Sequence, residues 1–176
     1  MNSKPIRALL LAAGLGTRLR PLTLKTPKCL IEINKKPILQ DWIEKLERIN
    51  TQKVLINTHY LHNKVESFLE KNTPIKIDLQ QSYEETLLGT AGTLIANYKF
   101  FENSLGLLIH ADNFSTFDLN KLIAAHHKRP STCLMTMLIF ESHKPSSSGI
   151  VELDRNNIVT AFHEKKINPP GNLANG

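Results

Sequence analysis

With 176 residues, the chain is long enough to bury a sizeable core, and we expect a single domain over residues 1–176. Hydrophobic residues make up 41% and charged residues 22%, which excludes an intrinsically disordered protein. The net charge of +6 suits a protein that binds polyanions, but scattered Lys and Arg and only 6% aromatic residues argue against nucleic acid.

The two cysteines and the apolar runs bear on location. Cys29 and Cys133 are far apart and form no C-x-x-C pair, so we expect buried, reduced thiols and a cytoplasmic protein. Lys4 and Arg7 precede an apolar run, as in a signal peptide, but the run is short and glycines interrupt it. No apolar run approaches the length of a membrane span, so we expect no membrane association.

The first predicted element is a strand over residues 8–13, an apolar run typical of a strand buried on both faces of a parallel sheet. A loop with Gly14 and Gly16 follows. Glycine lets backbone N–H groups turn toward a ligand and lets that ligand come close. The forked guanidinium of Arg18 and the ammonium of Lys28 suit phosphate oxygens. The loop therefore predicts a nucleotide-phosphate site.

Two common phosphate loops do not fit this stretch. The dinucleotide fingerprint G-x-G-x-x-G requires glycine where Leu19 stands, and the P-loop requires Lys-Ser or Lys-Thr after a glycine at a spacing that is absent here.

The rest of the chain alternates helix-like and strand-like segments. Apolar residues at helical spacing predict helices over 37–50, 61–71, 91–98 and 118–127, the last capped by Asp118. Short apolar or alternating runs predict strands over 53–58, 75–79, 105–110, 133–140, 149–153 and 158–163. Strands that alternate with helices through short connections predict an α/β fold with a mostly parallel sheet. Ligands of such sheets bind at the carboxyl ends of the strands.

Residues 14–28 fill every fixed position of G-x-G-T-R-L-x-P-L-T-x-x-x-P-K. This segment resembles the signature of the sugar-1-phosphate nucleotidylyltransferases, with the hexose and heptose 1-phosphate guanylyltransferases, such as those acting on mannose 1-phosphate, as the nearest likeness. The resemblance implies a three-layer, Rossmann-like nucleotidyltransferase fold. It also implies an enzyme that joins a nucleoside triphosphate to a sugar 1-phosphate in the presence of Mg²⁺.

Residues 83–92 extend the resemblance, because they match the family's E-x-x-x-L-G-T-A-G loop, which closes over the base and sugar of the nucleotide. A carboxylate accepts two hydrogen bonds side by side, which matches the N1–H and amine of guanine. Glu84 and Glu85 therefore favour GTP, whereas the nearby Gln80 and Gln81 leave uracil or thymine open. By this match and that of the first loop, the expected nucleotide-binding residues are Leu11, Ala12, Ala13, Gly14, Gly16, Thr17, Arg18, Glu85, Gly89 and Thr90.

An aspartate, Asp112, follows the predicted strand 105–110 and suits Mg²⁺, which prefers oxygen ligands. The family usually has Gly-Asp here. Ala111 keeps that position small, although His110 departs from the pattern. A helix-capping or turn role for Asp112 is the alternative.

Residues 148–154 and 158–175 resemble the family's sugar-binding half, although Ser148 replaces the usual Tyr and Lys166 the usual Pro. By that match, Gly149 offers backbone to the sugar, Glu164 accepts from sugar hydroxyls, Lys165 pairs with the sugar phosphate, and Asn172 lines the pocket.

The resemblance also implies a mechanism in which a sugar-phosphate oxygen attacks the α-phosphorus in line and pyrophosphate leaves. The catalytic residues would be Arg18 on the pyrophosphate, Lys28 and Lys165 on the reacting phosphates, and Asp112 on Mg²⁺. Family sequences generally run on and supply a second acidic metal ligand, so the domain as given lacks the usual C-terminal part. A non-catalytic nucleotide-sugar-binding or regulatory domain is the alternative, and a homodimer is left open.

Overall fold

The computed structural model describes residues 4–71 and 76–176. The chain divides into two compact units, one ending at Phe117 and the other beginning at Asp118. Among the described residues, no helix combines the length and the apolar character that crossing a bilayer requires.

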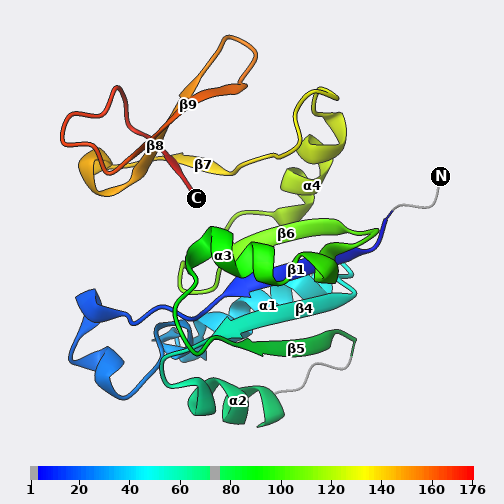
Figure 1. Ribbon diagram of the computed structural model, residues 1–176, viewed down its shortest axis with the longest axis vertical. Helices are drawn as coiled ribbons and strands as arrows, with labels where there is room; N and C mark the ends of the chain where they lie inside the picture. Colours follow the sequence, from blue (N-terminus) through cyan, green and yellow to red (C-terminus); the bar gives the residue numbers. More distant parts are fainter. Residues whose placement is uncertain (1–3, 72–75) are drawn as a thin grey trace. The chain divides into compact units, whose positions relative to one another are not determined.

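The first unit is built on a four-stranded parallel sheet in the order β5-β4-β1-β6. Its strands are β1 (Ile6–Leu11), β4 (Lys53–Thr58), β5 (Asp78–Tyr83) and β6 (Leu105–His110). Figure 1 shows α1 (Ile38–Arg48) behind this sheet and α3 (Gly89–Ala96) in front of it, with α2 (His62–Lys71) beside β5. The predicted three-layer α/β fold with a parallel central sheet is confirmed.

Burial explains why these segments pair as they do. Ala8, Leu9 and Leu10 in β1 have no exposed surface, as expected of a central strand covered on both faces. On α1, the apolar side chains share one buried face, and each contributes about 1.5–3 kcal/mol relative to exposure. These buried residues are Ile38, Leu39, Trp42, Ile43 and Leu46.

The strand order identifies the edge of this sheet, at the carboxyl ends of its strands, where a ligand is expected to bind. From β1 the chain moves outward on one side through β4 and β5, and then crosses to the other side of β1 as β6. The direction therefore reverses at β1, and parallel sheets bind ligands beyond the carboxyl ends of the strands at such a switch point. The segments after Leu11, Thr58, Tyr83 and His110 all begin at this edge.

The second unit begins with α4 (Leu119–Lys128), whose N-terminus is capped by Asp118, since its carboxylate accepts from the Asn120 N–H at 2.9 Å. An antiparallel sheet follows in the order β7-β10-β8-β9. Its strands are β7 (Ile139–Glu141), β8 (Gly149–Leu153), β9 (Val159–Glu164) and β10 (Leu173–Asn175). A short turn over residues 154–158 joins β8 to β9, so this pair is a hairpin and stands apart from the parallel sheet.

Several boundaries differ from the sequence-based expectation. The strand expected over 75–79 is β5, beginning at Asp78, and Ile75 lies outside the described residues. The strand expected over 133–140 shortens to β7, and β10 was not predicted. The shorter elements are β2 (Glu32–Ile33), β3 (Lys36–Pro37), and the 3₁₀ helices η1 (Thr17–Leu19), η2 (Leu22–Leu24), η3 (Lys28–Leu30), η4 (Tyr98–Phe101) and η5 (Pro145–Ser147).

Candidate functional site

The loop that leaves β1 is folded by its own glycine and threonine. Gly16 has φ +63°, a conformation that side chains rarely adopt, and its carbonyl accepts hydrogen bonds from Thr23 Oγ1 at 2.7 Å and from the Leu19 N–H at 3.0 Å. A Cβ on Gly16 would lie 2.8 Å from Thr23 Cγ2. Gly14 differs, because its φ is not in this region and a Cβ there would meet nothing within 4 Å. Of the two glycines in this loop, only Gly16 is required for folding.

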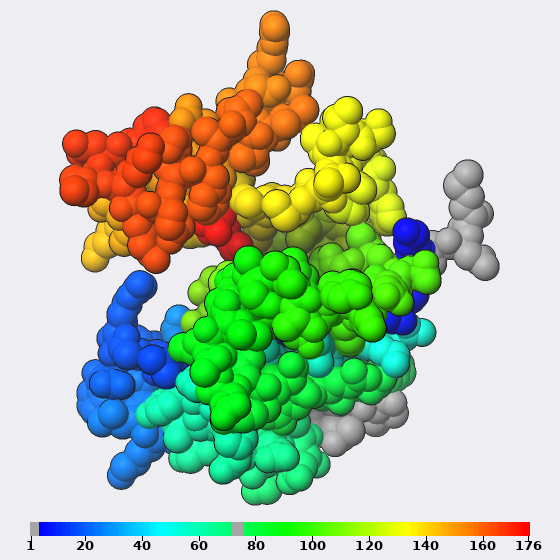
Figure 2. Space-filling view, viewed as in Figure 1, coloured from blue at the N-terminus to red at the C-terminus, as the bar shows by residue number. Residues whose placement is uncertain are grey.

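This loop and the end of β6 enclose a pocket of about 260 Å³. In the space-filling view, the blue segment after β1 projects at one end of the first unit (Figure 2). The pocket is lined by Gly16, Thr17, Arg18, Leu19, Lys28 and Asp112. The structure therefore gathers three side chains expected to act together, Arg18, Lys28 and Asp112, although 84 positions separate the last two in the sequence.

Charge in this pocket is organised around an ion pair. Lys28 Nζ lies 2.7 Å from Asp112 Oδ2, and both side chains keep between a quarter and a third of their surface exposed. Arg18 adds a second cation at the mouth. Arg18 and Lys28 can donate hydrogen bonds to the oxygens of a polyphosphate, and the Asp112 carboxylate can hold a cation that accompanies it.

The surroundings of Asp112 bear on its alternative roles. Helix capping falls to Asp118 instead, whereas the Asp112 carboxylate faces Lys28. Ala111 has no exposed surface and donates its N–H to the Leu11 carbonyl at 3.0 Å, which fixes the turn beside β1. Across the loop, the indole N–H of Trp42 donates to the Asn113 carbonyl at 2.8 Å.

The side chains around Asp112 fit Mg²⁺ only as an ion that is bound together with substrate phosphates. Among residues 4–71 and 76–176, no three His, Cys, Asp or Glu side chains cluster closely enough to form a metal cage. Mg²⁺ commonly binds through one or two carboxylates together with substrate phosphates and waters. Asp112 suits that mode, because it lines the same pocket as Arg18 and Lys28, the cations expected to bind phosphate.

None of residues 84–90 lines this pocket. Glu85 and Thr90 are exposed, and Gly89 has φ +70°, so glycine is needed there to begin α3. Glu84 is only 4% exposed, and its carboxylate accepts from Asn57 Nδ2 at 2.9 Å, from Thr93 Oγ1, and from the Leu88 N–H at 3.2 Å. In this structure the Glu84 carboxylate oxygens bind donors inside the protein, and base recognition by Glu84 and Glu85 stays a prediction.

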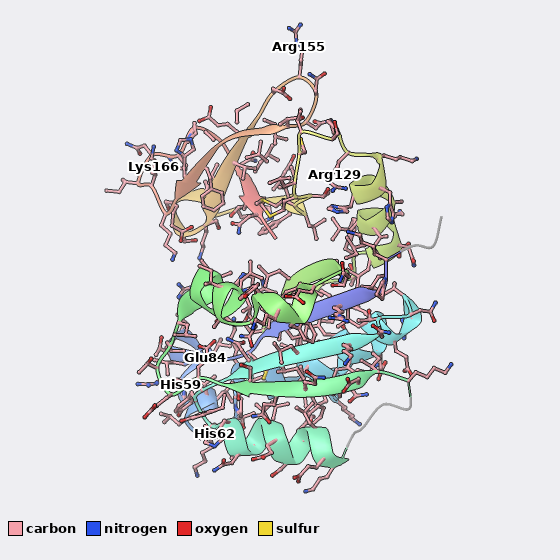
Figure 3. The ribbon with its side chains drawn as sticks, turned by 45° about the vertical axis from the view of Figure 1, so that its right-hand side comes forward. His59, His62, Glu84, Arg129, Arg155 and Lys166 are labelled. Atoms are coloured by element: carbon pink, nitrogen blue, oxygen red, sulfur yellow. The ribbon has the colours of Figure 1, made fainter. Side chains whose placement is uncertain are left out.

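Two opposing effects act on the Glu84 carboxyl group. Burial raises its pKa, while the hydrogen bonds from Asn57, Thr93 and the Leu88 N–H lower it more, so the pKa lies below the ordinary value. Figure 3 labels Glu84 and His59 close together, and His59 Nδ1 lies 2.8 Å from the Glu84 carbonyl oxygen.

Sequence analysis missed Asn57 and Thr93. Asn57 is 3% exposed at the end of the apolar run of β4, and its Oδ1 accepts from the Ala12 N–H at 2.7 Å. An amide side chain within an apolar run that predicts a buried strand could have indicated Asn57, because buried polar groups need hydrogen-bond partners.

The remaining expected residues lie in the second unit, where three of them meet. Gly149 pairs with Glu164 in the β8–β9 hairpin, and a Cβ on Gly149 would lie 2.5 Å from Phe162 Cζ and 2.6 Å from Asn175 Oδ1. Lys165 Nζ lies 2.9 Å from Glu164 Oε1, and both side chains are more than half exposed. Asn172 accepts at its carbonyl from the Ser142 N–H at 2.8 Å.

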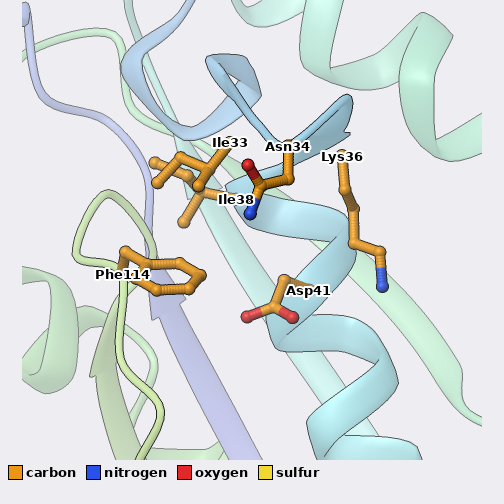
Figure 4. A pocket seen from close by; sticks show the side chains of 6 residues that line it. All are labelled: Ile33, Asn34, Lys36, Ile38, Asp41 and Phe114. Atoms are coloured by element: carbon orange, nitrogen blue, oxygen red, sulfur yellow. The ribbon is translucent and has the colours of Figure 1, made fainter.

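A second pocket of the first unit, about 200 Å³, is shown in Figure 4. It is lined by Ile33, Asn34, Lys36, Ile38, Asp41 and Phe114. Its cation and its anion already have partners, since Lys36 pairs with Glu44 at 2.8 Å and Asp41 pairs with Lys45 at 2.5 Å. The pocket at Arg18 has two cations, Arg18 and Lys28, for one carboxylate, and it is therefore the better anion site.

Comparison with known proteins agrees with this geometry. A family model described as nucleotidyl transferase matches residues 7–176. The mannose-1-phosphate guanylyltransferase catalytic subunit beta of Drosophila melanogaster is 34% identical over 164 residues, covering 90% of this chain and 43% of that protein. The UTP–glucose-1-phosphate uridylyltransferase of Synechocystis is 26% identical over 171 residues, covering 91% and 44% respectively. The chain thus spans less than half the length of these relatives.

Among solved structures, a UDP-glucose pyrophosphorylase complexed with UDP-glucose superposes with a TM-score of 0.82 at 20% identity. That match covers 97% of this chain and 73% of the other, and it shows a shared fold.

Proposed function

The chain belongs to the nucleotidyl transferase family, and from that premise we propose that the protein transfers a nucleotidyl group from a nucleoside triphosphate to a sugar 1-phosphate. The observation that carries this proposal is the pocket where Arg18, Lys28 and Asp112 meet at the switch point of the parallel sheet. By their names, both relatives described above transfer a nucleotidyl group to a sugar 1-phosphate.

In the proposed reaction, an oxygen of the sugar 1-phosphate forms a bond to the α-phosphorus, and the bond from that phosphorus to the pyrophosphate oxygen breaks. The nucleophile is already an anion, so no general base is needed. The protein must bring two repelling polyanions together and stabilise charge on the phosphate oxygens. Arg18 binds the departing pyrophosphate, Lys28 neutralises the α-phosphate, and Lys165 pairs with the sugar phosphate.

Asp112 would hold Mg²⁺ in this site, and the ion would supply positive charge that neutralises the phosphates. The Lys28 ammonium already lies on Asp112 Oδ2, so binding of a triphosphate with Mg²⁺ would require Lys28 to turn toward phosphate oxygens. In this proposal the Lys28 side chain breaks its ion pair with Asp112 and then binds the phosphates of the substrate.

GTP is the proposed nucleotide, and the contacts of β5 support that choice. Gln80 and Gln81 were the side chains that could have bound uracil or thymine, but both amides have other partners. Gln81 donates to Thr58 Oγ1 at 2.8 Å, and Gln80 donates to Asp78 Oδ2 at 3.0 Å. Glu85 is an exposed carboxylate four positions before Gly89. A carboxylate there can accept both guanine donors side by side.

A non-catalytic nucleotide-sugar-binding domain is the second candidate. It is favoured by one observation, which is that Asp112 belongs to no cluster of three or more His, Cys, Asp or Glu side chains in the described part of the chain. In that case the pocket would bind nucleotide without transferring it.

Measuring pyrophosphate release separates the two candidates. The protein is incubated with GTP, UTP, dTTP or CTP and a panel of sugar 1-phosphates, with and without Mg²⁺. Release that requires both substrates and Mg²⁺, and that is fastest with GTP, supports the proposal. Nucleotide binding by calorimetry without release from any pair supports the second candidate. The cytoplasmic location and a homodimer remain predictions.

A further inference from the structure

We propose that Trp42 and Lys45 of α1 are positioning residues, which bind the segment after Asp112 and so hold that carboxylate at the pocket of Arg18. Neither side chain lines this pocket, and both act through the backbone of residues 113–115. The inference deepens the proposed function, because it assigns two residues to the placement of the expected Mg²⁺ ligand. Its structural part stands independently of activity.

Two side chains of α1 bind the irregular segment that follows β6, residues 111–117. The indole N–H of Trp42 donates to the Asn113 carbonyl at 2.8 Å, and the Lys45 ammonium donates to the Ser115 carbonyl. These bonds span 71 and 70 positions of the sequence. They therefore fix where the segment lies relative to α1, which hydrogen bonds within a local turn cannot do.

The backbone is held on both sides of Asp112. Before it, the Ala111 N–H donates to the Leu11 carbonyl of β1 at 3.0 Å. After it, the Asn113 N–H donates to the carbonyl of the last residue of β6 at 3.1 Å, while the Asn113 carbonyl accepts from Trp42. With partners in β1, β6 and α1, the flanking peptide groups limit the directions in which the carboxylate can point.

The Lys45 ammonium is built into this contact. Its side chain is only 17% exposed, and Nζ pairs with Asp41 Oδ2 at 2.5 Å. Nζ also lies 4.9 Å from the ring centre of Trp42 and 5.4 Å from that of Phe114, and aromatic faces attract cations. Phe114 belongs to the same segment and, as Figure 4 shows, shares a pocket with Asp41. Lys45 thus binds the segment through a ring as well as through the backbone.

The ion pair with Lys28 cannot hold Asp112 throughout the proposed reaction. In that proposal Lys28 leaves the carboxylate when the triphosphate binds, so another restraint must hold residue 112 at that stage. The bonds from α1 do not involve the cations of the pocket, and they persist when Lys28 turns away. A ligand group that is already held in its productive geometry loses less freedom when it binds an ion.

The first test measures hydrogen exchange at single amides of the free protein. Lys45→Met keeps the apolar stem but removes the donor to Ser115. We expect the Asn113 amide to exchange at least tenfold faster, while the Leu9 and Leu107 amides of the sheet stay as in the wild type. Unchanged exchange at Asn113 in a folded variant would overturn the proposal, as would equal acceleration at Leu9 and Leu107, which indicates global destabilisation only.

Lys36→Met is the matched control for this test. It removes an ammonium that pairs with Glu44 at 2.8 Å, away from residues 113–115. The Asn113 amide should therefore exchange at the wild-type rate in this variant. Acceleration equal to that in Lys45→Met would contradict a specific role for Lys45.

The second test measures binding instead of turnover. Calorimetric titration with GTP, with and without Mg²⁺, gives the gain in affinity that the ion supplies. We expect Lys45→Met to reduce this gain by about tenfold and to leave GTP affinity without Mg²⁺ unchanged. An equal loss with and without Mg²⁺ would show that Lys45 does not act through Asp112. A wild-type protein without any Mg²⁺-dependent gain would overturn the assignment of Asp112 and the positioning role with it.

Conservative variants complete the test. Lys45→Arg keeps a cationic donor and should restore wild-type behaviour in both experiments, whereas Trp42→Phe keeps the ring without the N–H and should reproduce part of the loss. Failure of arginine to restore exchange at Asn113 in a folded variant would count against the proposal, and wild-type exchange in Trp42→Phe would exclude Trp42 from the role. If the wild-type protein releases no pyrophosphate, the proposed function fails, whereas the exchange experiment still tests the two residues of α1.

Discussion

Lys28 and Asp112 form an ion pair with 2.7 Å between Nζ and Oδ2, and this pair joins the end of the β1 loop to the segment after β6. Both side chains are partly exposed, and such pairs contribute about 0–1 kcal/mol to folding. The pair matters for placement, since it holds a cation and a carboxylate in one pocket before any substrate arrives.

Removing either member of this pair should therefore affect activity far more than stability. We expect Asp112→Asn to lower kcat by about 100-fold or more, because a preorganised charge is lost, while the free energy of unfolding changes by less than about 1 kcal/mol. Steady-state kinetics and denaturant unfolding measure the two effects. Lys36→Met is the matched control, since Lys36 pairs with Glu44 outside this pocket. A twofold effect of Asp112→Asn on kcat would contradict the assigned role.

Arg18→Ala should collapse turnover while nucleotide affinity falls only modestly. The guanidinium is assigned to charge that develops as pyrophosphate leaves, and a group that acts mainly in the transition state changes kcat more than binding. Stopped-flow turnover and calorimetric GTP binding provide the two numbers. Arg18→Lys keeps the charge without the fork and should recover only part of the rate. Equal losses in both measurements would place Arg18 in ground-state binding.

The two loop glycines form a matched pair for separating folding from binding. Gly16→Ala should destabilise the protein by about 1–3 kcal/mol, because it forces φ +63° on an alanine and brings its Cβ to 2.8 Å from Thr23 Cγ2. Gly14→Ala should leave thermal stability near wild type, since nothing lies within 4 Å.

Nucleotide affinity then separates the two glycines further. If the nucleotide approaches the Gly14 backbone, Gly14→Ala weakens GTP binding in a protein of normal melting temperature. Unchanged GTP binding in that variant would remove Gly14 from the nucleotide site.

Lys165→Met should act on the sugar substrate. Lys165 is paired with Glu164 in the exposed β9 turn and is assigned to the sugar phosphate. We expect the KM for the sugar 1-phosphate to rise about tenfold or more, with GTP binding by calorimetry unchanged. Lys166→Met, at the next position, is the control. A rise in the KM for GTP alone would move Lys165 to the nucleotide.

Glu84 should make stability depend on acid pH. Its pKa in the folded protein lies below the ordinary value of 4.5, so the folded state favours the ionised carboxylate. This contribution is fully present above pH 4.5 and is lost as pH falls through the folded pKa. The difference in free energy of unfolding between wild type and Glu84→Gln should therefore shrink below pH 4.5, as denaturant titrations at a series of pH values would show. A difference that grows as pH falls would contradict this sign.

The sequence was sufficient for the elements that local pattern determines. The first strand, the helix α1 and the Asp118 cap all appear, because side-chain periodicity and capping act within a few residues. The strand β1 lies at Ile6–Leu11 and not over the predicted residues 8–13. The signature over residues 14–28 also indicated the loop that lines the pocket.

Tertiary structure decided what long-range pairing controls. β5 begins at Asp78 because it pairs with β4, where Lys53 and Asp78 form an ion pair of 3.1 Å, and its polar sequence alone gave no such boundary. Only the folded sheet brings Lys28 to Asp112. Only the fold surrounds the Glu84 carboxylate with the donors of Asn57 and Thr93, because those donors come from β4 and α3.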